Sequence, residues 1–410
     1  MPSLADYEPV AGPSVIEELR ELGRRLKGRR VLMVNSTREG GGVAEILHRM
    51  IPLMEELGLT VRWEIVEGTE PFYRVTKTIH NALHGHPAHV TPEMRELFLD
   101  VGRRNANRLS LDDDLVFIHD PQPIVFVERR SRHAASRWLW RCHVDVSRPN
   151  QQVWDLLKPF ILQYDAAIYS SPAFAQQLAM RQILIAPSID PLSDKNCDLT
   201  KEEIEAILRR LDIPQDCPIV TQVSRFDYLK DPVGVIEAFL RVRRSIQCRL
   251  VLVGGPASDD PEGEEVLARA REAAQGHPEI HLLMLPPDSH REINALQRAS
   301  AVIVQKSLRE GFGLTVSEAL WKARPVVASA VGGIPLQVKH RHNGLLVHSV
   351  EGAAYAIRQL LNNPGYAKYL GENGREHVRQ NFLLTRHLRD YLLLFLTLGR
   401  SSDVVYLNGQ

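Results

Sequence analysis

The chain has 410 residues, of which 44% are hydrophobic and 24% charged, a composition typical of a globular protein with two or three domains. Its 50 basic and 50 acidic side chains balance to a formal net charge of zero, which gives no support for a nucleic-acid partner. It has no apolar run of membrane-spanning length, no signal-peptide pattern and four scattered cysteines without a CxxC pair, so we expect a cytoplasmic protein with reduced thiols and no membrane partner.

A glycine-rich loop follows the first predicted strand. Residues 1–12 are expected to form a loose tail and residues 15–26 an amphipathic helix. The apolar run 31–35 predicts a buried strand, and Gly40, Gly41 and Gly42 separate it from a helix over about 43–57. Glycines here let a phosphate or a sugar approach the backbone, although a flexible turn would also explain them. The spacing is not GxGxxG, so it does not indicate a nicotinamide cofactor.

Two polar segments resemble metal sites superficially. After a strand over 61–66, a polar helical segment over 73–85 carries His80, and further histidines follow at 84, 86 and 89. No cysteine or carboxylate frame accompanies them, so we expect this segment to line a cleft and not to bind a metal. The acidic triplet 112–114 precedes the strand 115–118, at the sheet end that does not bind ligands, and we expect a solvated turn there.

Histidines end two successive predicted strands. His119 and Asp120 follow the strand 115–118, and His143 follows an apolar stretch that begins at Trp138 and contains Arg141. Because the carboxyl ends of parallel strands meet at one edge of a sheet, both histidines should face one crevice. A single histidine at a strand end is more often a structural hydrogen-bonding group, but the pair favours a functional site. Strands over 166–170 and 183–187 complete this half.

The second half begins with a polar connection and a helix over 201–211. A strand over 218–223 is followed by Arg225 and Lys230, and a helix starts at Pro232. Two cations at a strand end can hold a diphosphate and offset charge on a departing nucleotide, although exposed loop cations would give the same pattern. Strands over 250–254 and 281–285 and a helix over 289–299 continue the alternation, which predicts two parallel α/β sheets.

Residues 301–329 form a strand–loop–helix–strand unit with two carboxylates. Glu310 lies in the loop after the strand 301–304, and Glu318 lies in the following helix, with seven residues between them. Gly311 and Gly313 let a ligand approach, and the start of the helix suits a phosphate. Glu318 could then accept hydrogen bonds from ribose hydroxyls. An acid near a helix start and an exposed helical glutamate are the alternative. Beyond residue 350 the chain is expected to be helical to about 398.

The string from Glu310 to Leu314, with Glu318-Ala319-Leu320, resembles the glutamate–seven–glutamate signature of retaining glycosyltransferases of family 4. The resemblance implies the GT-B fold, in which two Rossmann-like α/β domains face each other across a cleft. It places an acceptor-binding domain at 1–195, a nucleotide-sugar-binding domain at 196–380 and a C-terminal helix at 381–410 that returns to the first domain. Arg225 and Lys230 have the spacing of the family's diphosphate-binding pair.

Motifs around residues 35–45, 77–82, 119–123 and 140–145 are similar to those of the trehalose glycosyltransferring synthases, except that His84 stands where glutamine is expected. The resemblance implies reversible transfer of glucose from ADP-, UDP- or GDP-glucose to glucose, giving α,α-trehalose without a cofactor or a metal. It assigns catalysis to Glu310, His143, Arg225 and Lys230. Donor binding falls to Arg225, Lys230, Gly311, Phe312, Gly313, Leu314, Glu318, Gly41 and Gly42, and acceptor binding to Gly42, His80, Asp120, Arg141 and His143.

Other functions remain open at this point. A trehalose phosphorylase would share most of these motifs and use phosphate in place of the nucleotide, and a family 4 enzyme could use another acceptor. A catalytically inactive nucleotide-sugar-binding module is a third interpretation, which the intact set of Glu310, Glu318, Arg225 and Lys230 disfavours. The preferred nucleotide cannot be read from these residues. The N-terminal helix could support a homodimer, and the expected partners are otherwise the small-molecule substrates.

Overall fold

The computed structural model describes residues 2–38, 41–131, 135–255 and 261–398, apart from the side chains of residues 261 and 262. The chain divides into two compact units. Unit 1 contains the residues up to Pro187 together with the helix that begins at Leu384, and unit 2 contains Ser188 to Leu383. Each unit has one six-stranded sheet, in which all strand pairs are parallel. The predicted pair of parallel-sheet α/β domains is therefore present.

The sheet of unit 1 has the order β2-β1-β3-β4-β5-β6. Helices cover both of its faces, as a parallel sheet requires. Its strands are β1 Arg30–Asn35, β2 Thr60–Ile65, β3 Leu115–His119, β4 Arg137–Cys142, β5 Ala166–Tyr169 and β6 Arg181–Leu184. Its main helices are α2 Pro13–Leu26, α3 Gly42–Glu56, α4 Glu70–Leu83, α5 Pro92–Arg108, α6 Gln151–Ile161 and α15 Leu384–Leu398.

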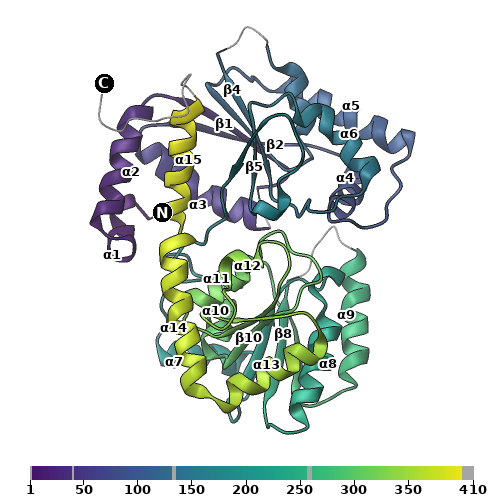
Figure 1. The fold of residues 1–410 in the computed structure, drawn as a ribbon, viewed down its shortest axis with the longest axis vertical. Helices are drawn as coiled ribbons and strands as arrows, with labels where there is room; N and C mark the ends of the chain where they lie inside the picture. The colour runs from purple at the N-terminus through teal and green to yellow at the C-terminus, as the bar shows by residue number, and fades with distance from the viewer. Residues whose placement is uncertain (1, 39–40, 132–134, 256–260, 399–410) are drawn as a thin grey trace. The chain divides into compact units, whose positions relative to one another are not determined.

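The two faces of this sheet pack against different helices (Figure 1). Trp138 and Trp140 of β4 belong to a hydrophobic core that includes residues of α4, α5 and α6. On the other face, the Phe117 ring lies 5.0 Å from the Tyr391 ring and 6.2 Å from the Phe395 ring, measured between centroids. Those rings belong to α15, which also packs on α2 and α3. The C-terminal helix is thus part of unit 1.

The sheet of unit 2 has the order β12-β11-β10-β7-β8-β9. Its strands are β7 Ile219–Val223, β8 Arg249–Gly254, β9 Ile280–Met284, β10 Val302–Gln305, β11 Val326–Ser329 and β12 Leu345–Val347. Its helices are α7 Lys201–Arg210, α8 Pro232–Arg243, α9 Pro261–Ala274, α10 His290–Ala299, α11 Leu314–Trp321, α12 Ile334–Gln337, α13 Val350–Asn362 and α14 Pro364–Asn381. The strands β7, β8 and β10 are buried along their whole length, which explains their nearly continuous apolar sequence.

The prediction of a loose N-terminal tail is wrong. Residues Leu4–Tyr7 form a 3-10 helix, and Glu8–Ala11 form the short helix α1. The Ser3 and Asp6 side chains cap the first turn, and Leu4 and Tyr7 are each 1% exposed. The Leu4 amide also donates to Glu56 Oε2 at 2.9 Å. Burial of these two apolar side chains orders a segment whose composition alone predicts little structure.

The acidic triplet 112–114 is not simply the solvated turn expected from the sequence. Asp113 is buried and pairs with Arg62 of β2. Asp114 Oδ2 accepts a hydrogen bond from the Arg30 amide at 2.9 Å. The triplet does lie at the amino end of β3, as predicted, but its role there is to connect β3 to β1 and β2.

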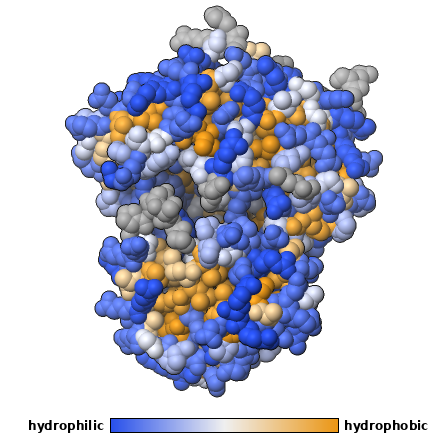
Figure 2. Space-filling model, turned by 180° about the vertical axis from the view of Figure 1, so that it is seen from behind, coloured by the Kyte–Doolittle hydropathy of each residue, from blue (hydrophilic) through white to orange (hydrophobic). Residues whose placement is uncertain are grey.

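The surface gives no test of the predicted homodimer. Figure 2 shows hydrophobic areas on one face that are interrupted by hydrophilic side chains. The exposed large hydrophobic residues are spread over both units and include Leu184, Tyr355 and Tyr369. Among the described residues, no helix has the length and the apolar character that crossing a bilayer requires. The homodimer stays a prediction.

Candidate active site

Glu310 lies at the carboxyl end of β10, in the loop that leads to α11. The residue is 7% exposed, and its carboxylate receives three donors on one oxygen. Glu310 Oε2 accepts from Lys230 Nζ at 2.6 Å, from Ser307 Oγ at 3.1 Å and, at the longer distance of 3.4 Å, from Gln305 Nε2. The other oxygen, Oε1, accepts no hydrogen bond from the residues that the structure describes. Three donors from different parts of unit 2 therefore hold one oxygen of the carboxylate.

Lys230 reaches Glu310 from the loop after β7, eighty residues earlier in the chain. Asp227 shapes this loop because its Oδ1 accepts from the Leu229 amide at 2.8 Å. The carbonyl of Lys230 accepts from Gln222 Nε2 at 2.7 Å. Arg225 lies in the same loop, half exposed, with Nη2 at 3.3 Å from Asp227 Oδ2. Two of the predicted diphosphate-binding residues thus lie on one loop, and Lys230 brings that loop to Glu310.

Glu318 is a buried residue of α11, not the exposed helical glutamate that the alternative interpretation expected. It is 3% exposed, and its Oε1 lies 3.8 Å from Lys195 Nζ. Lys322 is buried beside it and donates to Asn196 Oδ1 at 2.9 Å and to the Glu318 carbonyl at 3.1 Å. Burial lowers the pKa of Lys322 to about 7, against the opposing effect of Glu318.

Sequence reasoning missed Lys195 and Lys322 as neighbours of Glu318. Lys322 follows Glu318 by four residues, a spacing that brings side chains together on a helix, so its position could have been found. Lys195 belongs to the connection before α7 and carries no local signal that would place it near α11.

Glycines let a second loop pack directly on the Glu310 loop. Gly332 has a φ of +56°, and a Cβ atom there would lie 1.6 Å from the Glu310 carbonyl oxygen. At Gly333 a Cβ would lie 2.8 Å from the Gly311 carbonyl oxygen. Gly313 caps the amino end of α11 with a φ of +80°, and Leu314 is the first helical residue. Phe312 is buried, with its ring 5.5 Å from that of Phe382.

The Gly332→Ala variant is expected to lose most of its activity or to fail to fold. The new methyl group cannot coexist with the Glu310 carbonyl at this separation, so the Glu310 loop would have to move. Activity and the urea midpoint should both be measured, with Gly365→Ala as the control because a Cβ at Gly365 meets no atom within 4 Å. Normal activity of Gly332→Ala would contradict the described packing.

Unit 1 brings together His119, Asp120 and His143. His119 Nδ1 lies 3.1 Å from His143 Nε2, and the two rings are nearly parallel at an angle of 12°. Asp120 has a φ of +63°, and its Oδ1 accepts from the His143 amide at 2.8 Å. Trp140 Nε1 donates to the Asp120 carbonyl at 3.0 Å. The two strand-end histidines therefore lie together at one edge of the sheet, and the crevice that they were expected to face stays a prediction.

Arg141 lies beside His119 on the neighbouring strand and is 0% exposed. Its Nη1 makes a long hydrogen bond of 3.4 Å to the Tyr169 carbonyl, and its Nε and Nη2 have no partner among the described residues. Burial lowers the pKa of the guanidinium, while Tyr391 and Asp120 oppose that change. A direct contact with an acceptor sugar would need this side chain to become accessible, so that role stays a prediction.

The buried arginine affects the charge of the surrounding groups. Burial, with a contribution from Arg141, lowers the pKa of His119 to about 3 and that of His143 well below its usual value. The pKa of His387 of α15 shifts in the same direction. Burial raises the pKa of Asp120 to about 6, although the His143 amide and Arg141 favour its charged form. The imidazoles are therefore neutral near pH 7.

Lowering the pH from 7 to 5 is expected to lower the free energy of unfolding. In the unfolded chain a histidine binds a proton near pH 6.5, whereas the folded His119 binds one only near pH 3. At pH 5 the proton therefore stabilises the unfolded state, and His119 alone lowers the free energy of unfolding by about 2 kcal/mol. His143 and His387 act in the same direction. Asp120 acts oppositely, because its raised pKa makes folding more favourable as the pH falls from 6 to 4. Urea midpoints at the two pH values measure the net effect, and an unchanged midpoint would contradict it.

The remaining predicted residues lie on α3 and α4 of unit 1. Gly41, with a φ of +84°, is the N-cap of α3, and Gly42 is its first residue. Residue 40 lies outside the described residues. His80 is a partly buried residue of α4, with its ring 4.9 Å from that of His84. Within the described residues, no group of three or more histidine, cysteine, aspartate or glutamate side chains is arranged to hold a metal ion.

Comparison with known proteins decides the family. Residues 33–176 match the family model described as trehalose synthase, N-terminal domain, and residues 203–377 match glycosyl transferases group 1. A trehalose synthase from Rubrobacter xylanophilus is 45% identical over 406 residues, which cover 97% of each chain. The chain belongs to the trehalose synthase family. It is therefore a glycosyltransferase.

More distant similarities agree with this membership of the trehalose synthase family. A trehalose phosphorylase from Pleurotus pulmonarius is 25% identical over 98% of this chain, which spans 62% of that protein. The solved structure of a UDP-forming α,α-trehalose-phosphate synthase from Burkholderia vietnamiensis has a TM-score of 0.75 at 17% identity, covering 92% of this chain and 99% of that one. At that identity the structural similarity concerns the fold alone.

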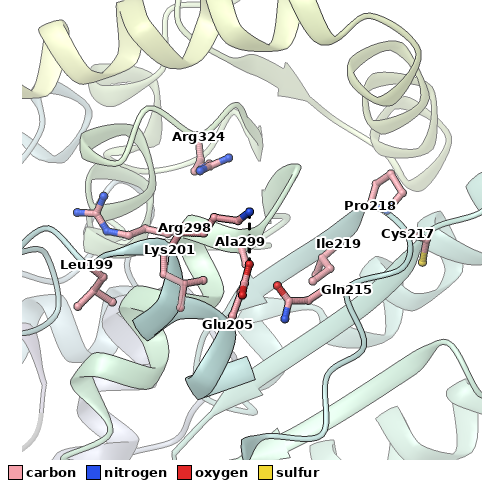
Figure 3. Close-up of a pocket in the computed structure, with 11 residues that line it drawn as sticks. Leu199, Lys201, Glu205, Gln215, Cys217, Pro218, Ile219, Arg298, Ala299 and Arg324 are labelled. Atoms are coloured by element: carbon pink, nitrogen blue, oxygen red, sulfur yellow. Dashed lines mark ion pairs between the residues drawn. The ribbon is translucent and has the colours of Figure 1, made fainter. Parts of the chain in front are cut away.

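A separate cavity of about 490 Å³ opens at the amino ends of the strands of unit 2 (Figure 3). The donor-site candidates of this trehalose synthase family member lie at the carboxyl ends of the same strands. Most charged groups of the cavity have partners. Lys201 Nζ lies 3.5 Å from Glu205, and Arg298 Nη2 lies 2.9 Å from Asp198. None of the donor-site candidates lines this cavity.

Proposed function

We propose that this member of the trehalose synthase family transfers glucose from a nucleoside diphosphate glucose to free glucose, with retention, to give α,α-trehalose. The observation that carries the proposal is the ion pair of 2.6 Å between Lys230 and Glu310. It fixes a carboxylate and a cation together at the carboxyl end of a parallel sheet, where α/β folds bind their ligands. One carboxylate oxygen is left to accept a sugar hydroxyl.

The donor would be held by unit 2. Lys230 and the half-exposed Arg225 provide positive charge for the diphosphate. The backbone from Gly311 to Leu314 opens α11, whose free N–H groups also favour a phosphate. Glu318, near Lys195, would accept ribose hydroxyls after exchanging that contact. The glucose moiety would bind Glu310 through Oε1. The acceptor would bind unit 1, at Asp120, His143 and His80 together with Gly42.

The bond changes are those of a single transfer step. The bond between the anomeric carbon and the diphosphate oxygen breaks, and a bond to the acceptor hydroxyl oxygen forms on the same face. The hydroxyl proton passes to the departing diphosphate, whose negative charge Lys230 and Arg225 offset. A double displacement would need a free carboxylate nucleophile about 5 Å from an acid. Glu310 is engaged by Lys230 and Ser307, so we assign it an electrostatic role and not a nucleophilic one.

A trehalose phosphorylase is the second candidate. The Pleurotus relative carries that name, and Arg225 with Lys230 could bind orthophosphate as well as a diphosphate. The higher identity to a trehalose synthase over nearly the whole chain favours a synthase over a phosphorylase.

The reverse reaction separates the two candidates. The purified protein is incubated with trehalose and either ADP, UDP, GDP or orthophosphate, and released glucose and the sugar nucleotide are quantified. Glucose release that requires a nucleoside diphosphate, with matching formation of the sugar nucleotide, is the expected result. Release with orthophosphate alone would overturn the nucleotide-dependent assignment, and no release with any of them would exclude trehalose as the product.

A further inference from the structure

A single hydrogen bond joins the rings of the two strand-end histidines, His119 and His143. His119 Nδ1 and His143 Nε2 are 3.1 Å apart, so one of these nitrogens donates and the other accepts. Either His119 donates from Nδ1, or His143 donates from Nε2. In the first arrangement, His143 carries its own proton on Nδ1. In the second, Nδ1 of His143 is an acceptor. The choice decides whether His143 offers a donor or a base to a substrate.

The buried surroundings of His119 discriminate between the two arrangements. His119 is 1% exposed, and its Nε2 has no partner among the described residues. If His143 donated, the neutral His119 would have to carry its proton on Nε2, which would leave a buried N–H without an acceptor. A buried orphan N–H is more costly and rarer than an unpaired acceptor. The second arrangement is therefore disfavoured by the packing alone.

Arg141 strengthens this preference. It is the register neighbour of His119 on β4, and its buried Nε and Nη2 donors also lack partners among the described residues. An additional unpaired N–H in this positive environment would be repelled, whereas a lone pair on His119 Nε2 would be stabilised. Asp120 does not supply the missing acceptor: its Oδ1 accepts from the His143 amide, and neither His119 Nε2 nor these two Arg141 nitrogens has a partner among the described residues.

We propose that His119 is a positioning residue that donates from Nδ1 to His143 Nε2 and thereby fixes His143 as the Nδ1–H tautomer. His143 then presents an N–H donor to a substrate oxygen and does not act as a general base. The inference rests on the proposed function for the role of His143 at the substrate, but the tautomer itself is a property of the protein without substrate.

The groups around the pair preserve this state over a wide pH range. Besides Asp120 and Arg141, the titratable and charged neighbours are Cys142 on β4 and Arg386, His387, Asp390 and Tyr391 on α15. Burial and Arg141 lower the pKa values of His119 and His143. The rate of turnover is therefore expected not to change between pH 6.5 and 8 through titration of either histidine. If a histidine acted as a general base in this range, the rate would instead rise as that histidine lost its proton.

A matched set of variants tests the positioning role. In His119→Asn the new side-chain amide can place an N–H donor where the wild type has Nδ1, whereas His119→Leu removes the donor at similar size. We expect His119→Asn to keep kcat within roughly 3-fold and His119→Leu to lose roughly 10-fold, with unchanged affinity for the nucleoside diphosphate. Equal losses in both variants, in proportion to their loss of stability, would overturn the positioning role. His348→Asn, at an exposed histidine, is the control.

Nitrogen NMR tests the tautomer directly. The protein is labelled with ¹⁵N-histidine, and the His143 signals are assigned by their absence from the His143→Asn variant. Protonated Nδ1 and unprotonated Nε2 for His143 at pH 7 are the expected result, and the reverse would overturn the inference. This readout needs no turnover, so an inactive wild-type protein would refute the proposed function without deciding the tautomer.

Discussion

Replacing Glu310 with glutamine is expected to lower kcat for glucose transfer by roughly 10²–10³-fold, the effect of removing one preorganised electrostatic group. Glutamine keeps the shape of the side chain but removes the negative charge that Lys230 faces at 2.6 Å. The Glu310 loop should keep its position, because Gly332, Gly333 and Gln337 still pack on it. Steady-state kinetics with saturating donor and acceptor measure the change.

The control for this experiment is Glu265→Gln. Glu265 is 65% exposed on α9 and pairs with Arg269 one turn away, so its loss should leave turnover unchanged. Circular dichroism and the urea midpoint of Glu310→Gln should stay near those of the wild type. Turnover within about 3-fold of the wild type in a folded Glu310→Gln variant would refute the role of Glu310 in the donor site, because the loss expected there is far larger.

Replacing Lys230 with methionine is the second large expected loss. Methionine keeps much of the side-chain volume but leaves the buried Glu310 carboxylate without its cation. We expect kcat/KM for the donor to fall by roughly 10²–10³-fold, because both the ground-state diphosphate and the developing charge lose a partner. The stability should also fall, since a buried charge without its partner is strongly destabilising.

The double variant Glu310→Gln with Lys230→Met separates these two effects. Its stability should recover toward that of Glu310→Gln, because no unpaired carboxylate remains, while its activity should stay low. Lys201→Met is the single-site control, since Lys201 is 84% exposed. If Lys230→Met retained donor affinity and turnover, the assignment of the diphosphate site would be wrong.

Most of the fold was predictable because its strands are short apolar runs that end in polar residues. Glu310, Asp120 and His143 each follow such a run, and the structure places them after β10, β3 and β4. The helices α5, α6, α9 and α12 and the strand β12 were not predicted. The sequence of α5 has a low mean hydropathy, and β12 has only three residues, so neither shows a strong periodic pattern of hydrophobic residues.

The contacts of the site could be predicted only in part. The proximity of His119 and His143 follows from strand order and needs no side-chain detail. The contact between Glu318 and Lys195 does not follow from strand order, because these two residues are more than a hundred positions apart and meet only through the tertiary packing around α11. The ordered N-terminal helices have the same cause, since Leu4 and Tyr7 gain their structure from tertiary burial.

The most direct test of the proposed reaction is the forward transfer followed by proton NMR. The protein is given glucose with ADP-, UDP- or GDP-glucose, and the anomeric signals of the product are recorded. If the donor's anomeric configuration is retained and glucose is transferred to the anomeric hydroxyl of the acceptor glucose, the product is symmetric α,α-trehalose. Its two glucose units give the same anomeric signal, and an equal amount of nucleoside diphosphate is released. A product with two different anomeric signals, or no disaccharide from any of the three donors, would contradict it.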